Sequence, residues 1–473
     1  MTNSAKLAIL LASAALPLAA CSPSEYQMRS ANSVAPAPTP AKAKNVILFI
    51  GDGMGISTVT AARIYEGQKR GESGEENVLS FEKFENVALV KTYNTNAQVP
   101  DSAGTATAIH SGQKTNIGFL GVGPQAARGS CADTLAHPLP QLGEEVKEKG
   151  LALGIVSTAR ITHATPASVY ARASDRNWEA YVEASDEDSG AVCDDIASQL
   201  VGTDFDVALG GGTRSFYGSE QGGRRLEKNA DLPAGWVART GGTFVTDREA
   251  LAAAPMDKPV FGLFGSSHMD FMAAPDRDTS QPTLTEMTSQ AIARLKNDPD
   301  GFYLMVESGR IDHAHHGGRA GPALEETVEF ARAVQYAVEN TDPAETLILV
   351  TADHSHVFTI SGYPRRGNDI LGIVVPPEEG GEEVATATLA SDGKPYTTLG
   401  YANGPGAIAN MAERPVPETG MAAVQQAAIP KDSETHAGED VALYATGPGS
   451  ERARGVIEQN LIYDMIRKAF GWE

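Results

Sequence analysis

Basic residues are scarce in this chain of 473 residues. It has 38 Lys and Arg against 60 Asp and Glu, which gives a formal net charge of −22. Such a surface repels nucleic acids and anionic lipids, which argues against a role in binding polyanions. It also repels an anionic small molecule, unless the site that receives the molecule has cations of its own. The hydrophobic content of 41% is that of a globular protein, and the length suits either two or three domains or one large α/β enzyme.

Long apolar runs are absent beyond the N-terminus. The run "LAILLASAALPLAA" follows Lys6, is shorter than the ~20 residues that a membrane span needs, and reads as an export signal over residues 1–20. It ends in "LAAC", and a small-residue run closed by Cys21 resembles the lipobox of bacterial lipoproteins, in which the Cys becomes the acylated N-terminus. A plain signal peptide with a chance Cys is the alternative. Residues 21–44 are rich in Ser, Ala and Pro and predict a flexible tether, so we expect a lipid-anchored protein of the periplasm or cell surface.

Cysteine is also rare, with three in the whole chain. After Cys21 there remain Cys131 and Cys193, and two cysteines in an exported chain predict a disulfide. This bond would close a loop of roughly 60 residues and stabilise the fold by about 4 kcal/mol on the chain-entropy model. Two free thiols are the alternative.

Short apolar runs rich in β-branched residues alternate with segments of helical pattern, and no internal repeat is found. Such alternation predicts an α/β fold with a mostly parallel central sheet flanked by helices on both faces. The runs span 45–50, 87–93, 151–158, 206–210, 301–307 and 346–352. Residues 363–430, rich in Pro, Gly and acids, predict a crown-like insertion within a domain that runs from 45 to 473. The tail "RGVIEQNLIYDMIRKAFGWE" has helical spacing and predicts a terminal helix.

Polar side chains follow these runs at their carboxyl ends. Asp52, in "FIGDGMG", follows the first run, His163 and Thr165 follow the third, Glu307 ends the fifth, and Asp353 follows the sixth. Because ligands gather beyond the carboxyl ends of strands in open α/β sheets, residues far apart in the sequence are expected to meet in one pocket.

The segment "VPDSAGTATAI" places Ser102 between an acid and a run of small residues. Asp101 is a good N-cap, so Ser102 is expected at a helix N-terminus, where the aligned dipoles favour an alkoxide or a bound phosphate. No His neighbours Ser102, so a Ser–His dyad would need a partner from elsewhere. An ordinary capped helix is the alternative.

Two further segments crowd acids and imidazoles together. "VESGRIDHAHH" places Asp312 and His316 four residues apart, on one face of a helix, which is a common metal-binding geometry. "LVTADHSH" and "ETHAGED" add further carboxylate and imidazole groups. This mixture of donors suits zinc beside a harder, all-oxygen magnesium site. The candidate ligands in these segments are Glu307, Asp312, His316, Asp353, His354 and His436, with His356 beside them.

The motifs "GDGMG", "PDSAGTATA", "THATP…DRNW", "VESGRIDHAHH", "VTADHSHVF" and "THAGEDV" occur in the order found in alkaline phosphatases. From about residue 45 to the C-terminus the chain resembles this family, and it is more similar to the vertebrate branch than to the best-known enterobacterial member. The resemblance implies a non-specific phosphomonoesterase that acts on small phosphate monoesters at alkaline pH through a phosphoserine. It also implies a homodimer. The cations of the site would then allow an acidic protein to bind an anionic substrate.

The resemblance implies two Zn²⁺ ions and one Mg²⁺ ion. Asp52 would bridge one zinc and the magnesium, Ser102 would be the nucleophile, and Arg176 in "DRNW" would clamp two phosphate oxygens. The remaining roles, by matched position, are Ser102, Asp353 and His354 on the first zinc; Asp312, His316 and His436 on the other; Thr165 and Glu307 on the magnesium; His313 toward the substrate; and His163 and His356 behind the ligands. Cys131 and Cys193 fall where a disulfide of the family lies.

The chain departs from parts of the family's pattern. His163 and His313 stand where the enterobacterial pattern has Asp and Lys, and a neutral His near the magnesium weakens its binding. Gly265 and Gln281 stand where vertebrate members have acids that hold a structural calcium, so we do not expect calcium here.

The alternatives are a sibling enzyme on the same scaffold, such as a phosphodiesterase or sulfatase, and a non-catalytic binding protein. A sulfatase would need C/S-x-P-x-R around Ser102, which the sequence lacks, and a phosphodiesterase usually lacks the Arg clamp and the third metal. A non-catalytic, lipid-anchored protein that binds phosphate or metal has no need for a nucleophile-type Ser beside three metal sites.

Overall fold

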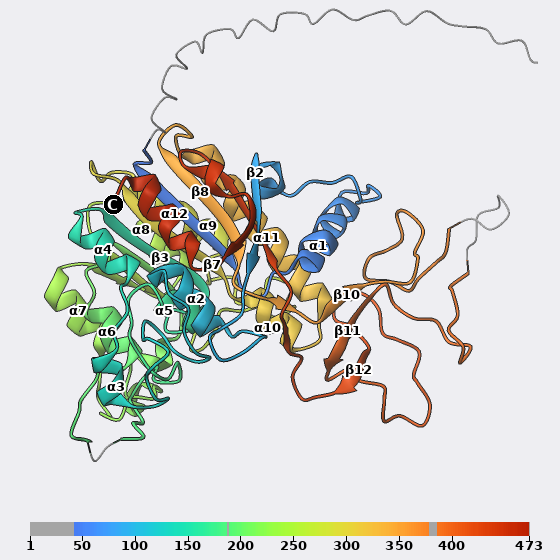
Figure 1. The fold of residues 1–473 in the computed structure, drawn as a ribbon, viewed down its shortest axis with the longest axis horizontal. Helices are drawn as coiled ribbons and strands as arrows, with labels where there is room; N and C mark the ends of the chain where they lie inside the picture. Colours follow the sequence, from blue (N-terminus) through green and yellow to red (C-terminus); the bar gives the residue numbers. More distant parts are fainter. Residues whose placement is uncertain (1–41, 187–188, 378–385, 473) are drawn as a thin grey trace, which may run out of the picture. The chain divides into compact units, whose positions relative to one another are not determined.

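The computed structural model describes residues 42–472 apart from 187–188 and 378–385 (Figure 1). The predicted signal, Cys21 and most of the predicted tether lie outside the described residues. At the described end of that tether, Ala43 is buried and its N–H donates to the carbonyl of Ala469, so the packed domain already includes residue 43. Among the described residues, no helix combines the length and apolarity needed to cross a membrane.

A ten-stranded sheet forms the centre of the domain, in the order β15-β2-β14-β8-β1-β7-β3-β4-β6-β5. Only β14 runs antiparallel to its neighbours β8 and β2, and the other paired strands are parallel. The strands are β1 (Asn45–Gly51), β2 (Asn86–Lys91), β3 (Ala152–Arg160), β4 (Val207–Gly211), β5 (Thr243–Val245), β6 (Val260–Leu263), β7 (Phe302–Ser308), β8 (Thr346–Ala352), β14 (Val441–Thr446) and β15 (Gly455–Glu458).

Helices cover both faces of this sheet, as the alternation of patterns predicted. On one face α9 (Leu284–Leu295) packs on β3 and β7, and α11 (Ala320–Asn340) packs on β1 and α9. On the other face α4 (Leu142–Glu148) packs on β3 and α12 (Leu461–Phe470) on β1, in front of the sheet in Figure 1. The central strands are therefore buried on both sides, which explains their continuous apolar runs. The remaining helices are α1 (Ile56–Lys69), α2 (Ser102–Ser111), α3 (Cys131–Ala136), α5 (Ala164–Ala167), α6 (Ile196–Gly202), α7 (Leu232–Thr240), α8 (Arg248–Ala253) and α10 (Arg310–His316).

The predicted insertion contributes two strands, β11 (Leu399–Gly404) and β12 (Ala427–Pro430), to a separate, smaller sheet whose third strand is β10 (Phe358–Ile360). Figure 1 shows this sheet away from the central sheet. A two-stranded ladder joins β9 (Ser355–His356) to β13 (His436–Ala437). This ladder matters for the site, because it brings together residues about 80 positions apart.

The prediction of one terminal helix was wrong for its first half. Residues 455–458 form β15, which pairs in parallel with β2, and the helix begins only at Leu461. Pairing along the open edge of β2 satisfies backbone groups that a helix would otherwise satisfy internally. The structure also bonds Cys131, at the start of α3, to Cys193, with their Cα atoms 5.8 Å apart.

Candidate active site

The predicted ligands converge at one edge of the central sheet. Asp52 directly follows β1, Glu307 lies near the end of β7, and Asp353 directly follows β8; these three strands are adjacent and parallel. All three carboxylates are fully buried. Their carboxyl-terminal position is the one expected for a ligand site in an open α/β sheet.

A tight turn fixes Asp52. Gly53 has φ 69°, and a Cβ at this position would lie 2.4 Å from the ring of His356, so only glycine fits. The N–H of Gly53 donates to Asp353 Oδ1 at 2.9 Å. The turn thus ties the end of β1 to the end of β8.

Ser102 is the first residue of α2, which confirms the predicted helix start. The Asp101 carboxylate caps the helix by accepting from the N–H of Gly104 at 3.0 Å, and Ser102 Oγ lies 3.2 Å from His354 Nε2. The same Asp101 accepts from Arg176 Nη1 at 3.0 Å. One acid therefore places both the predicted nucleophile and the predicted phosphate clamp.

Three imidazoles present Nε2 lone pairs to this site. The Nδ1 of His436 lies 2.8 Å from the carbonyl of Pro100, that of His316 lies 2.6 Å from the carbonyl of Glu434, and that of His354 lies 3.3 Å from the carbonyl of Ser355. Because a carbonyl only accepts, Nδ1 carries the proton in each case and Nε2 remains an acceptor. Backbone carbonyls commonly fix the tautomer of metal-binding histidines in this way.

The facing groups form one set around Asp312. His436 Nε2 and His316 Nε2 are 3.1 Å apart. Asp312 Oδ1 lies 3.2 Å from His316 Nε2 and 3.4 Å from His436 Nε2. Two lone pairs and a carboxylate that face one another fit a cation between them. Burial lowers the pKa of His316, but Asp312 outweighs it and raises this pKa above its ordinary value, so the carboxylate favours positive charge at this place.

A second set lies around Asp52 and Asp353. His354 Nε2 lies 3.4 Å from Asp52 Oδ1 and 3.4 Å from Asp353 Oδ2. Both Asp52 oxygens and Asp353 Oδ2 are buried without a hydrogen-bond partner. Burial, followed by repulsion from Asp353 and other acids, raises the pKa of Asp52 well above its ordinary value, and burial raises the pKa of Asp353 to about 6. A buried anion without partners is costly, so this set also fits a cation.

A third set combines oxygen donors with one imidazole. Thr165 Oγ1 and Glu307 Oε1 are buried without a hydrogen-bond partner, and Ser157 donates to the other Glu307 oxygen. His163 can join Asp52 and Glu307 in this group. Burial raises the pKa of Glu307 to about 7. Within the described residues, three groups of carboxylates and imidazoles lie close enough together to hold a metal: Asp312 with His316, His356 and His436; Asp52 with Asp312 and His354; and Asp52 with His163 and Glu307.

His356 links two acids behind the site. Its Nε2 lies 2.9 Å from Asp312 Oδ1 and its Nδ1 lies 2.5 Å from Glu434 Oε2. Burial opposes protonation, but these two contacts outweigh it and raise the pKa of His356 to about 9. The charged imidazole therefore orients Asp312. Glu434 was missed by sequence reasoning, although it lies two residues before His436.

Arg176 faces the same edge. Its Nη2 lies 3.0 Å from His163 Nε2. Burial, followed by the charge of Arg176, lowers the pKa of His163. The ring of His313 is 5.5 Å from that of His163, and its Nδ1 is buried without a hydrogen-bond partner. Both departures from the enterobacterial pattern therefore lie together, beside the guanidinium.

Gly265 and Gln281, which stand where vertebrate members have calcium-binding acids, are neighbours in the structure. A Cβ on Gly265 would lie 3.8 Å from Gln281 Nε2, and Gln281 Oε1 accepts from the N–H of Asp270 at 2.9 Å. The two positions therefore face the same space, and neither has a carboxylate.

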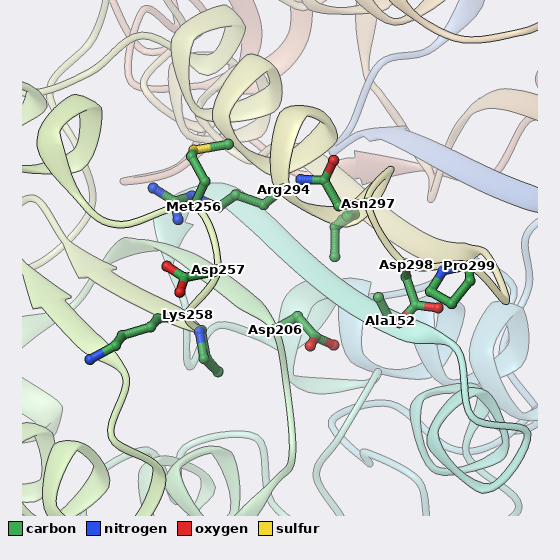
Figure 2. A pocket seen from close by; sticks show the side chains of 11 residues that line it. Ala152, Asp206, Met256, Asp257, Lys258, Arg294, Asn297, Asp298 and Pro299 are labelled. Carbon is green, nitrogen blue, oxygen red and sulfur yellow. The ribbon is translucent and has the colours of Figure 1, made fainter.

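The pocket in Figure 2 belongs to the opposite edge of the sheet. Ala152 begins β3, Asp206 and Pro259 directly precede β4 and β6, and Arg294 lies at the end of α9. This edge carries the amino ends of the strands, so the pocket is separate from the ligand sets.

Together, the parallel sheet, three adjoining groups of ligand-type side chains and a serine at a helix start are typical of a metal-dependent hydrolase with an α/β fold. A family model described as "Alkaline phosphatase" matches residues 43–471, and the chain belongs to this family. It acts as a phosphomonoesterase.

Known relatives agree with this assignment. The tissue-nonspecific alkaline phosphatase of Gallus gallus is 43% identical over 89% of this chain and 83% of the relative, and an alkaline phosphatase of Gadus morhua is 42% identical over 89% and 90%. The solved alkaline phosphatase of the Antarctic bacterium TAB5 is 25% identical, with a TM-score of 0.63 over 91% of this chain and 99% of that one. The Thermus thermophilus alkaline phosphatase is 23% identical with a TM-score of 0.65, over 92% and 93%, and shares the fold.

Proposed function

We propose that this chain hydrolyses phosphate monoesters in two displacements through Ser102, on a centre of two Zn²⁺ ions and one Mg²⁺ ion. One observation carries the proposal: Nε2 lone pairs from three histidines and unpartnered carboxylate oxygens converge beside Ser102 Oγ. The family membership supplies the reaction, and the geometry supports this way of performing it.

The donor chemistry supports the division of metals. The set of Asp312, His316 and His436 has nitrogen and oxygen donors, which suit zinc, as does the set of Asp52, Ser102, Asp353 and His354. The oxygens of Asp52, Thr165 and Glu307 suit magnesium. When bound, these ions supply Lewis acidity that lowers the pKa of a hydroxyl or a water and offsets charge on the leaving oxygen.

The chain's own residues position the phosphate. The Arg176 guanidinium, held by Asp101, offers paired N–H donors to two phosphate oxygens. Ser102 Oγ loses its proton to solvent and forms a bond to phosphorus as the ester P–O bond breaks, and the alcohol leaves with the electron pair and takes a proton from water. Water then loses a proton to solvent as it attacks phosphoserine, the P–O bond to Ser102 breaks, Oγ regains a proton, and inorganic phosphate leaves. Charge neutralisation and in-line positioning dominate the catalysis of such transfers.

Three finer points complete the proposal. The chain is attached to a membrane of the periplasm or cell surface through an acylated Cys21, as "LAAC" predicts. It pairs with a second copy as a homodimer, and it acts non-specifically on small phosphate monoesters. The positive site accounts for an anionic substrate on a chain of net charge −22.

Metal analysis of the purified protein tests the centre. We expect two zinc ions and one magnesium ion per chain, with Asp312→Asn losing one zinc and Glu307→Gln losing the magnesium. A chromogenic monoester should be hydrolysed far faster than the matching diester or sulfate ester. One metal per chain, or a preference for the diester, would contradict the proposal.

A further inference from the structure

Three guanidinium groups and one imidazole form a strip beside Arg176, outside the proposed metal ligands. We call this strip the basic rim: Arg160, Arg214, His268 and Arg310. It connects to the phosphate clamp through His163, whose Nε2 lies 3.0 Å from Arg176 Nη2 and whose ring is 5.5 Å from that of His268. All four side chains of the rim are partly exposed, so the strip is open to a ligand.

The inner part of the rim is held by one acid. Arg160 donates to Glu179 Oε1 at 2.7 Å through Nη2 and to Oε2 at 2.8 Å through Nε, and the hydroxyl of Thr162 also donates to Oε2 at 2.5 Å. A further nitrogen of Arg160 contacts His268, whose ring is 3.9 Å from that of His313. Glu179 therefore neutralises Arg160 and is fully engaged in doing so.

Arg214 is the cation of the rim that has least compensation. It follows β4, where the N–H of Arg214 donates to the carbonyl of Ser266 at 3.2 Å. Its guanidinium makes no hydrogen bond or ion pair with any residue that the structure describes, and its Nε is buried. Burial, followed by the charge of Arg160, lowers the pKa of Arg214, and Glu179 opposes this only in part.

Arg310 completes the rim from the other side. Its guanidinium lies 3.6 Å from the centre of the Phe271 ring, and its Nε is buried without a hydrogen-bond partner. The acids whose charges act on Arg310 include Glu326 and Asp270, and burial raises the pKa of Glu326 to about 7. Burial therefore opposes the charged form of Glu326, which weakens its compensation of Arg310.

We propose that the basic rim binds a second phosphate group of the substrate, carried on the alcohol part of the monoester. The preferred substrates are then compounds with two separated phosphate groups, one at Arg176 and one at the rim. Guanidinium groups with free donors bind phosphate oxygens in pairs, and the rim offers such donors on a protein of net charge −22. The inference rests on the proposed position of the reacting phosphate beside Arg176.

A series of alkanediol bisphosphates of increasing length, each compared with the alkyl phosphate of the same length, tests the rim. We expect kcat/KM per phosphate end to be about tenfold higher for the bisphosphate at one chain length, as hydrogen bonds to a charged group imply. This preference should fall as ionic strength rises. Hydrolysis of the alkyl phosphates themselves tests the proposed function separately, because it does not involve the rim.

Arg214→Met should bring the ratio of bisphosphate to alkyl phosphate close to one. Lys258→Met is the matched control, since it removes the same charge from an exposed residue at the opposite edge of the sheet (Figure 2) and should keep the ratio. If Arg214→Met does not fold, the wild type alone tests the proposal, through the dependence of the bisphosphate preference on chain length and on ionic strength. A ratio near one at every length, or a preference that survives in Arg214→Met, overturns the proposal.

Discussion

Replacing Glu307 by Gln should stabilise the metal-free protein at alkaline pH and destabilise the metal-loaded protein. Burial is the main reason that the pKa of Glu307 rises from 4.5 to about 7 in the folded chain. At 1.36 kcal/mol per pH unit this corresponds to about 3 kcal/mol. Because the folded-state pKa is the higher one, the stability contributed by this group is complete below pH 4.5 and is lost as the pH rises through 7.

Gln has no proton to lose, so the difference between variant and wild type isolates Glu307. The pH dependence of the wild type's free energy of unfolding would not isolate Glu307 by itself. Burial also lowers the pKa of several imidazoles, among them His163, His315 and His354. In these the unfolded state binds more protons, so their contribution to stability rises with pH up to about 6.5. Both proteins share these groups, which cancel in the difference.

Urea unfolding of chelator-treated protein measures the effect. The variant and the wild type should be about equally stable at about pH 5, and the variant more stable by up to ~3 kcal/mol at about pH 8. With metals bound the order should reverse, because the variant lacks a proposed magnesium ligand. Glu326→Gln is the control: burial raises the pKa of Glu326 to about 7 as well, but it is not a ligand, so its gain should appear in both states. A metal-free Glu307→Gln that gains nothing between the two pH values would refute the reasoning.

Three further predictions concern the anchor, the magnesium set and the residues behind the zinc set. Cys21→Ser should release an active enzyme from the detergent phase, and an unmodified N-terminus well beyond Cys21 in the wild type would contradict the anchor. His163→Asp should tighten magnesium binding and lower turnover at high pH, because it adds a negative charge beside Asp52 and Glu307; equal or weaker affinity in a magnesium titration would count against this. Glu434→Gln should weaken zinc binding by roughly 10- to 100-fold, because His356 then loses the carboxylate that fixes its ring, and an unchanged zinc titration would remove Glu434 from the account.

The central strands were predictable because each is buried on both faces. "NVILFI" and "TLILVTA" became β1 and β8, and the residues that follow them became site residues. The short strands β5 and β6 have only three and four residues, too few for a periodic signal. β15 was not predictable, because it lies in a tail whose spacing suits a helix. It forms a strand by pairing with β2, which is distant in the sequence.

The candidate site was predictable as a set of ligands but not as a network. The double contact of Asp101 was hidden, because the N-cap position explains the residue without reference to Arg176. Glu434 looks like a surface acid in "KDSETHAGED", yet it is buried, because the ladder of β9 and β13 brings it against His356. Spacing along one segment cannot reveal contacts that a distant strand pairing creates.

The central claim is that catalysis passes through a phosphoserine at Ser102. The most direct measurement is the ratio of transferred to hydrolysed phosphate in the presence of an amino-alcohol acceptor, over monoesters with different leaving groups. If every substrate forms the same phosphoserine after its alcohol has left, the ratio depends on acceptor concentration and not on the leaving group. A ratio that changes with the leaving group would mean that water attacks the ester directly and that Ser102 is not the nucleophile.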